Sequence, residues 1–261
     1  MMEELDFRSR YMELDDKTDE LKEWIDEYGP RCCEFSEHFE ISWIYHENAL
    51  EGVVLTYHEI KAAIDQKIIS DVNLISTYQE IKNQKEAVEF VRRAAGNKRT
   101  RINLEFIKKL HGILCNDVEG SEVGRYRRDI PLHRTYFHEI TQPAKIAPRL
   151  AQLLQGANSN DFRRWHPIKQ AAAFHHEFMQ IFPFSEHSGM VGRMLMNYYL
   201  MRAGYMPAVI HSVDRQRYYE SLRGVPRALR ELIVDSMDNS LESGIRYLHE
   251  LVQGPQSMSA Q

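Results

Sequence analysis

The chain has 261 residues, of which 43% are hydrophobic and 27% charged, and its formal net charge is −5. These values are typical of a globular protein, and no run of eighteen apolar residues predicts a membrane span. The negative charge argues against a general nucleic-acid-binding surface. The acidic N-terminus shows no targeting pattern and three cysteines leave an odd count, so we expect one domain in the reducing cytoplasm.

The first half of the chain is predicted to be helical. Leu104, Ile107 and Leu110, for example, recur at the spacing of one helix face. Further along, residues 124–142 contain few helix formers, a central proline, and apolar residues at even spacing, which favours a short β-hairpin. The helices expected before this segment cover residues 15–28, 33–50, 56–65, 72–95 and 101–116.

Helices resume after the predicted hairpin. One of them contains three consecutive alanines and ends at Phe182-Pro183, because proline disfavours a helical conformation in the residue before it. We expect helices at residues 146–155, 167–181, 190–203 and 214–251, with a break near residues 224–226 in the last. The chain is therefore predicted to be mainly α, with a small β flap.

The loop between two of these helices, residues 182–193 (FPFSEHSGMVGR), carries the chemistry. A small-residue loop that enters a helix N-terminus presents backbone N–H groups and the positive end of the helix dipole to an anion. Gly189 and the residues around it have this composition. The pattern therefore predicts a phosphate-binding site at the start of the helix that follows.

The same loop resembles the catalytic loop of the Fic (Fido) domain family, HPF-x-D/E-G-N-G-R-x-G-R. The resemblance covers about residues 40–225. It implies a Fic-type helical bundle with a β-hairpin flap, divided into N-terminal helices at 1–60, a core at 61–225, and a C-terminal helix with a disordered tail at 226–261. The matching segments are HPI at 166–168, His175, FPF at 182–184, Glu186, Gly189, VGR at 191–193, MLMN at 194–197, GRYR at 124–127, GYMP at 204–207 and the Tyr218 helix.

The resemblance implies a role for each loop residue. Glu186 matches the acid that holds Mg²⁺ on the nucleotide phosphates, a role that suits a hard carboxylate oxygen. Arg193 matches the arginine that contacts the terminal phosphates of ATP. Ser188, Gly189 and Gly192 complete the expected nucleotide site. ATP and Mg²⁺ are therefore the expected ligands if the loop retains binding.

Three positions depart from the family pattern. Phe182 replaces the histidine that takes the proton from the attacking hydroxyl, Ser188 replaces an asparagine, and Met190 replaces an arginine. Loss of a general base typically costs about 10²- to 10⁴-fold in rate, and we do not expect His187 to substitute for it. We expect AMP transfer to a protein hydroxyl to be impaired. The alternatives are an atypical but active nucleotidyl or phosphoryl transferase, or a protein-binding module without catalysis.

A helix near the N-terminus resembles the inhibitory helix of the same family, whose motif is S/T-x-x-x-E-G/N. Counting from Ser42 puts His46 at the glutamate position, whereas anchoring on Glu47 puts Trp43 where a serine or threonine belongs. We favour an ion pair between Glu47 and Arg193 that blocks the γ-phosphate position. The alternative is an ordinary helix with Glu47 in solvent.

The expected partner is a protein target docked on the β flap by strand addition. The basic side chains Arg125, Arg127, Arg128 and Arg134 of that segment are expected to be solvated, with target docking as the alternative. A second copy of the chain is a further candidate partner, and neither membrane nor nucleic acid is expected.

Overall fold

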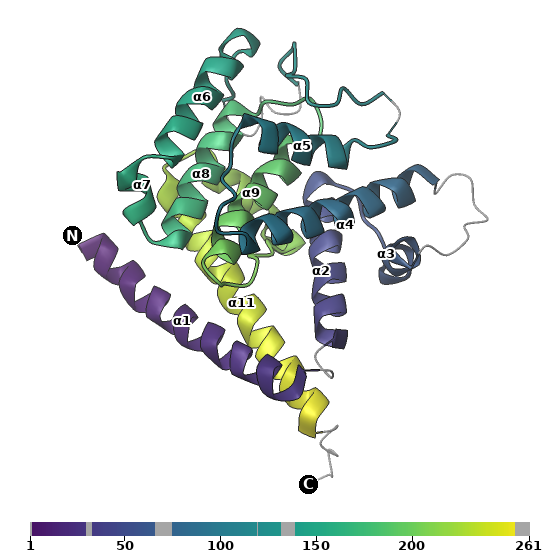
Figure 1. Cartoon of the computed structure of the whole chain (residues 1–261), viewed down its shortest axis with the longest axis vertical. Helices are drawn as coiled ribbons and strands as arrows, with labels where there is room; N and C mark the ends of the chain where they lie inside the picture. The colour runs from purple at the N-terminus through teal and green to yellow at the C-terminus, as the bar shows by residue number, and fades with distance from the viewer. Residues whose placement is uncertain (1, 30–32, 66–74, 119, 132–138, 254–261) are drawn as a thin grey trace.

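The computed structural model describes residues 2–29, 33–65, 75–118, 120–131 and 139–253, and it is built from helices (Figure 1). The helices are α1 (Met2–Tyr28), α2 (Cys33–Glu51), α3 (Tyr57–Ile64), α4 (Ile75–Gly96), α5 (Leu104–Leu114), α6 (Ile146–Ala157), α7 (Asn160–Arg164), α8 (Pro167–Ile181), α9 (Ser188–Arg202), α10 (Arg215–Ser221) and α11 (Pro226–Gln253). Two short 3₁₀ helices, η4 (Pro143–Lys145) and η5 (Ser212–Asp214), complete the set. Among the described residues, no helix is both long and apolar enough to cross a bilayer.

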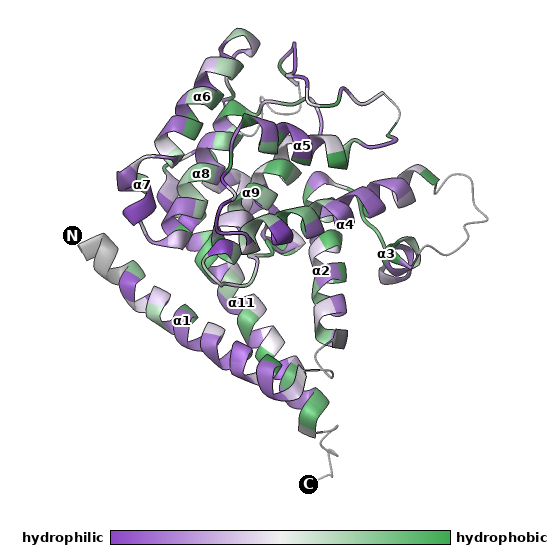
Figure 2. Ribbon diagram, viewed as in Figure 1, coloured by the Kyte–Doolittle hydropathy of each residue, from purple (hydrophilic) through white to green (hydrophobic). Residues whose placement is uncertain are grey.

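Helices α8 and α9 form the centre of the bundle, where they pack against each other and against α4, α6 and α11. The reason is visible in the sequence, because α9 is apolar nearly all round and its residues from Ser188 to Tyr198 are buried. Ala171 and Ala172 of α8 are also fully buried and allow close packing with α9. Figure 2 shows hydrophobic residues on the helices at this centre and mainly hydrophilic ones on outlying helices such as α1.

Helix α1 lies along α11 at one side of the molecule (Figure 1). Its buried side chains Phe7, Tyr11 and Leu14 follow the i, i+4, i+7 spacing of one helix face, and Leu21 continues that face. Helix α2 approaches the core with its C-terminal end, so that the residues from Trp43 to Leu50 reach the start of α9. This placement brings the predicted inhibitory helix to the predicted phosphate loop.

The predicted β-hairpin at residues 124–142 is wrong. No strand occurs in the described part of the chain, and residues 132–138 of this segment, including Arg134, lie outside it. The backbone groups pair with the end of α8 instead of with each other: the N–H of Arg127 donates to the carbonyl of Pro183 (3.0 Å), and the N–H of Thr141 donates to that of Gln180 (2.8 Å). The segment therefore wraps the C-terminal end of α8.

Arg127 explains why this arrangement is stable. The side chain is buried, and its Nε donates to the carbonyl of Phe182 (2.7 Å) while its Nη2 donates to those of Ile181 (3.3 Å) and Thr141. A cation at a helix C-terminus is favourable, and here it satisfies carbonyls that have no partner within the helix. The expectation that Arg127 is solvated is therefore wrong, whereas Arg125 and Arg128 are exposed.

The predicted helix positions are otherwise close to those observed, with four differences. Helix α1 begins at Met2 rather than residue 15, α5 covers Leu104–Leu114 rather than residues 101–116, α7 was not expected, and α9 begins at Ser188 rather than residue 190. The break in the last helix is confirmed, since Pro226 opens α11. The earlier start of α9 matters for function, because it places Ser188 and Gly189 inside the first helical turn.

Candidate functional site

The loop between α8 and α9 begins at Phe182, which ends α8 in the left-handed backbone conformation (φ 46°). Such a conformation is rare for a bulky side chain and is maintained by the surrounding structure. The Phe182 ring is 1% exposed and belongs to the hydrophobic core, and its N–H donates to the carbonyl of Phe178 (2.8 Å). The side chain at the position of the family base is thus an apolar plug at the end of the helix.

The first turn of α9 forms the anion-attracting end of the site. His187 precedes the helix in a left-handed conformation, and the helix proper starts at Ser188. The Ser188 hydroxyl accepts from the N–H of Phe184 (2.8 Å) and donates to the carbonyl of the same residue (2.9 Å), so it fixes the shape of the loop. The first N–H groups of a helix have no partner within it, and here they lie at the positive end of the dipole.

Arg193, one turn into α9, is 1% exposed and is surrounded by acceptors. Its Nε donates to Glu47 Oε2 (2.7 Å), its Nη2 to Glu51 Oε1 (2.9 Å), and its Nη1 to the Tyr218 hydroxyl (3.4 Å). The guanidinium also lies over the Tyr218 ring, 5.6 Å from its centroid. Two carboxylates from α2 therefore neutralise the buried guanidinium of Arg193.

Glu51 also covers the first turn of α9. A Cβ built on Gly189 would overlap Glu51 Oε1, so the carboxylate lies directly against the backbone of Gly189. A carboxylate at a helix N-terminus takes the place that a phosphate oxygen would favour there. The Glu51 side chain is 24% exposed, whereas Glu47 beneath it is buried, so Glu51 forms the solvent-facing part of the contact.

The charge states of the buried groups follow from this arrangement. Burial alone would lower the pKa of Arg193, but the carboxylate of Glu47, assisted by Tyr218 and Glu51, raises it well above the usual value. Burial raises the pKa of the Glu47 carboxyl, and the donors on Arg193 and Trp43 oppose that effect. The arginine is therefore permanently charged, and the site is built to hold negative oxygen atoms next to it.

Helix α2 is held in this position by several contacts. The Trp43 indole Nε1 donates to Glu47 Oε1 (3.2 Å), and the Asn48 and Gln84 amides exchange two hydrogen bonds of 2.7 and 2.9 Å between α2 and α4. The carbonyl of Leu50 accepts from Arg215 Nε (2.9 Å) and the Tyr219 hydroxyl (3.0 Å). The C-terminal end of α2 is thus fixed to both α4 and α10.

These contacts decide between the two alignments of the inhibitory motif, one counted from Ser42 and the other anchored on Glu47. The expected ion pair between Glu47 and Arg193 is present, and Trp43 occupies the position of the motif's serine or threonine and donates to the glutamate as a hydroxyl would. Ser42 is half-buried and, within the described residues, makes no hydrogen bond to Glu47 or Arg193. The inhibitory role itself stays a prediction.

Glu186 lies on the outer side of the loop. Its side chain is exposed, and Oε2 accepts from the Ser121 hydroxyl (3.0 Å). Together with His111 and Cys115 it lines a small hollow of about 120 Å³. No group of three metal-ligating side chains occurs in the described part of the chain. Glu186 could therefore hold Mg²⁺ only together with ligand oxygens such as phosphates, which is a common arrangement for this ion.

A buried histidine supports the site from behind. His175 on α8 lies 3.0 Å from the Tyr218 hydroxyl through its Nε2, and its ring packs against the backbone of Gly192. Because Tyr218 also accepts from Arg193, these three residues form one buried chain of contacts. His175 therefore has a structural role here, and a Cβ at position 192 would lie only 3.0 Å from its ring.

Comparisons with known proteins agree with this geometry. Residues 101–200 match the family model described as "Fic/DOC family". The chain carries a domain of the Fic/DOC family. Over 93% of its length it is 27% identical to a protein adenylyltransferase Fic of Aedes aegypti, and over 69% it is 31% identical to one of Nematostella vectensis. The chain spans about half the length of such relatives, 48% and 42% respectively.

Solved structures show the same Fic fold. A Fic-domain signalling protein from Bacteroides thetaiotaomicron superimposes with a TM-score of 0.76, covering 97% of this chain and 100% of that one at 20% identity. A variant of Fic-1 from C. elegans gives a TM-score of 0.80, covering 96% of this chain and 74% of that one, also at 20% identity. At such identities the likeness supports the fold of the Fic domain and not its activity.

The Fic loop brings most of the predicted site residues together. Ser188, Gly189, Gly192 and Arg193 share the first turns of α9, with Glu47 in contact, whereas Glu186 faces solvent and Ser42 takes no part. Sequence reasoning missed Glu51. Its spacing from Glu47, one helical turn further on, places both carboxylates on the same face of α2, and this signal could have found it.

Proposed function

We propose that this chain binds ATP with Mg²⁺ at the N-terminus of α9 and that its capacity to transfer AMP to a protein hydroxyl is impaired. The observation that carries the proposal is the buried cation of Arg193, which already holds two carboxylates against the first turn of α9. The relatives' name, protein adenylyltransferase, supports the reaction class and the donor.

Each residue has a separate task in this proposal. Arg193 binds the terminal phosphate oxygens, and the N–H groups around Gly189 bind the others at the positive end of the helix dipole. Ser188 keeps the loop in shape through its two bonds to Phe184. Glu186 would hold Mg²⁺, whose charge offsets that of the phosphates and favours attack at phosphorus.

The impairment follows from Phe182. A phenyl ring has no atom that accepts a proton, and this one is buried in the core beneath the loop. Loss of the base costs about 10²- to 10⁴-fold in rate. Met190 is uncharged as well as buried, so its position supplies no cation to the phosphates.

Helix α2 adds a second restraint. Glu47 and Glu51 occupy Arg193, so a bound nucleotide must displace at least the Glu51 carboxylate from the first turn of α9. Two negative groups and a triphosphate cannot share one guanidinium without strong repulsion. We therefore expect nucleotide binding to be weak while α2 is docked.

The proposal is tested by transfer of label from ATP labelled in the α-phosphate. The unaltered chain should label itself or added protein slowly, and Phe182→His combined with Ser188→Asn and Met190→Arg should raise the rate about 10²-fold or more. Rapid labelling by the unaltered chain that survives His187→Ala would overturn the impairment. If the triple variant binds no ATP, the assignment of the nucleotide site would be wrong.

A further inference from the structure

A cluster of cations lies at the other end of α9, about 20 Å along the helix axis from Gly189. We call this cluster the basic surface; it consists of Arg93, Lys98, Arg99, Arg101 and Lys109, from the end of α4, the middle of α5 and the loop between the two helices. All five side chains are exposed. Arg93 contacts Glu89 (3.5 Å), and within the described residues no ion pair forms at the other four. The cluster is notable in a chain whose net charge is −5.

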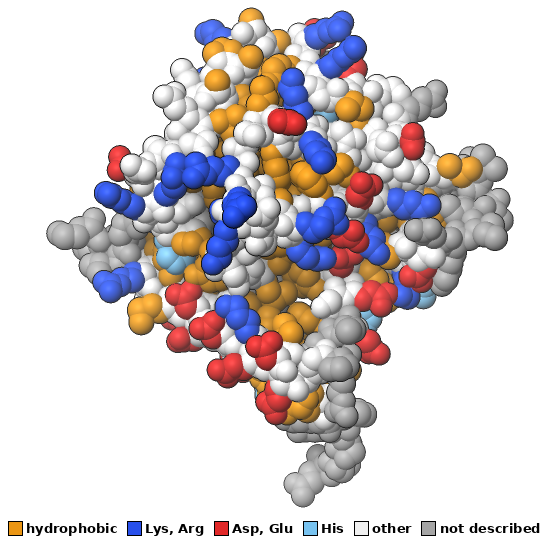
Figure 3. All heavy atoms as spheres, in the orientation of Figure 1, with side chains coloured by type: hydrophobic (Ala, Val, Ile, Leu, Met, Phe, Trp, Pro, Cys, Tyr) orange, Lys and Arg blue, Asp and Glu red, His pale blue; other side chains and the backbone are white. Residues whose placement is uncertain are grey.

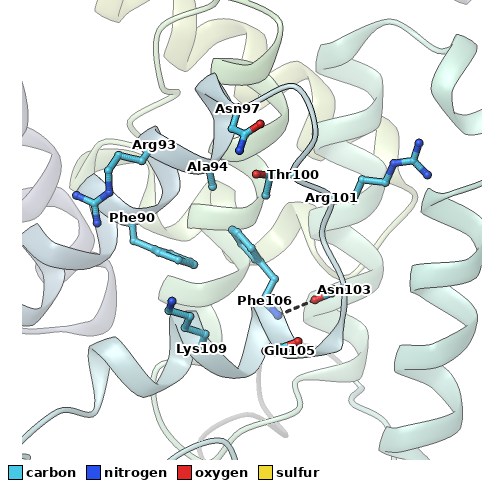
Figure 4. A pocket seen from close by; sticks show the side chains of 10 residues that line it. All are labelled: Phe90, Arg93, Ala94, Asn97, Thr100, Arg101, Asn103, Glu105, Phe106 and Lys109. Carbon is cyan, nitrogen blue, oxygen red and sulfur yellow. Dashed lines mark hydrogen bonds between the residues drawn. The ribbon is translucent and has the colours of Figure 1, made fainter.

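Three residues of the basic surface, Arg93, Arg101 and Lys109, line a hollow of about 600 Å³ with an apolar floor (Figure 4). Phe90 and Phe106 form the floor, with ring centroids 4.9 Å apart, and Lys109 Nζ lies over the Phe90 ring. Glu105 is the one carboxylate among the residues that line this hollow. An apolar centre within a charged rim is the usual composition of a protein interface.

The loop that carries these cations is rigidly attached to α9. Arg202 donates to the carbonyls of Asn97 (3.1 Å), Thr100 (2.9 Å) and Lys98 (2.5 Å), and the Tyr198 hydroxyl also donates to that of Thr100 (2.8 Å). A preorganised loop loses little conformational entropy when a partner binds. The cations are therefore presented in a fixed arrangement rather than on a free loop.

The opposite charge lies on α1. Its outer face carries an acidic stripe, which we define as Asp16, Asp19, Glu20, Glu23 and Glu27, all exposed, and Met12 lies on the same face and is 60% exposed. At 100° per residue these positions fall within one side of the helix. The stripe is about 16 Å long. Lys22 pairs with Asp19 (3.0 Å) and leaves the stripe strongly negative. Figure 2 shows the hydrophilic character of this helix.

Both features belong to one face of the molecule. Figure 3 shows blue side chains grouped around an apolar hollow in the centre of the view, with some red side chains to their right, and a row of red side chains along the lower left edge, over α1. Two copies can face each other across a two-fold axis that lies in the plane between them. The acidic end of one copy then lies opposite the basic end of the other. Each copy would then present its acidic stripe to the other's basic surface, which is the isologous geometry of most dimers.

We propose that the basic surface binds the acidic stripe of a second copy, giving a two-fold dimer with two identical contacts. Complementary charges determine which surfaces meet, and the apolar hollow receives Met12 at the centre of each contact. The contact leaves the first turn of α9 outside the interface. This association does not depend on the nucleotide site.

Sedimentation at increasing protein concentration tests the proposal, together with two charge-reversed variants of the whole chain. One variant carries Arg101→Glu and Lys109→Glu, the other Glu20→Lys and Glu23→Lys. Each variant alone should dimerise at least about tenfold more weakly than the unaltered chain, because the reversed side chains meet like charges and nearly cancel the charge left on their own patch. An equimolar mixture of the two should restore a dimer, since both contacts of the mixed dimer regain opposite charges.

The controls separate this dimer from other outcomes. Raising the salt from about 0.1 M to about 1 M shortens the Debye length from roughly 10 Å to about 3 Å and should dissociate the dimer. Lys145→Glu with Arg149→Glu, two exposed cations of the η4–α6 segment, should leave it unchanged. A mixture that stays monomeric would overturn the proposal. So would a monomeric unaltered chain whose basic surface binds a labelled single-stranded oligonucleotide or an acidic peptide.

Discussion

Glu51 Oε1 lies against the backbone of Gly189, at the point where the first turn of α9 exposes its N–H groups. The same oxygen accepts from Arg193, so one carboxylate contacts both parts of the proposed phosphate site. On the buried side of the same guanidinium, Glu47 Oε2 accepts from Arg193 Nε. The two glutamates are one helical turn apart on α2, so α2 covers the start of α9 with two carboxylates.

The two glycines of α9 should differ in their tolerance of a methyl group. In Gly192→Ala the new Cβ would lie 3.0 Å from the His175 ring and 3.1 Å from Phe178, both buried, and overpacking of this kind costs about 1–3 kcal/mol. In Gly189→Ala the new Cβ would overlap Glu51 Oε1 and lie 3.0 Å from Arg193 Nη1. Both atoms are the far ends of long side chains, and Glu51 can move into solvent, so the cost should stay below about 1 kcal/mol. Urea denaturation of both variants measures the difference. Equal costs would show that Glu51 is not the displaceable group.

The buried ion pair should be sensitive to removal of one partner. Arg193→Met leaves the Glu47 carboxyl buried without its cation, which should lower the free energy of unfolding by about 3–5 kcal/mol. Combining it with Glu47→Leu should recover part of this loss, because a well-packed apolar pair needs no compensation for lost hydration. Arg149→Met, which breaks the exposed pair with Glu177, is the control and should cost less than about 1 kcal/mol. A similar small cost for Arg193→Met would contradict the buried geometry.

Stability should fall in acid because of two histidines. Burial, assisted by the charge of His211, lowers the pKa of His46 to about 4, and burial, assisted by His187, lowers that of His111 to about 4. The unfolded chain takes up these protons near the usual histidine pKa of about 6.5, so between about pH 6.5 and 4 it binds more protons than the folded chain. The free energy of unfolding must therefore decrease as the pH falls through this range.

Thermal unfolding between pH 7 and pH 4 measures this loss of stability, and histidine variants show which side chains cause it. His46→Asn and His111→Asn should each show a smaller acid-induced decrease in Tm than the unaltered chain. His46 Nδ1 accepts from the N–H of Ser212 (3.1 Å), so protonation also removes a contact between α2 and η5. His58→Asn, at an exposed position, should keep the full decrease. Unchanged acid sensitivity in both of the first two variants would refute the assignment.

The helical part of the fold could be predicted because periodic apolar residues and proline positions specify helices locally. The conformation of residues 124–142 could not be predicted, because a segment that wraps a helix end can show the same alternating apolar pattern, here around Ile130 and Ile140, as a β-hairpin. The decisive contacts, from Arg127 to the carbonyls of Ile181 and Phe182, are tertiary and leave no local signal. The pairing of Glu47 with Arg193 was expected from the family resemblance alone, because 146 residues separate them.

Binding of ATP with Mg²⁺, measured by isothermal titration, tests the central claim most directly. The unaltered chain should bind weakly, and Glu47→Gln with Glu51→Gln should bind at least about tenfold more tightly, because α2 then no longer competes for Arg193 with negative charge. Adding Arg193→Met to that variant, with the fold verified by circular dichroism, should abolish the gain. Equal affinity of the unaltered chain and the double variant, or full affinity without Arg193, would contradict the account.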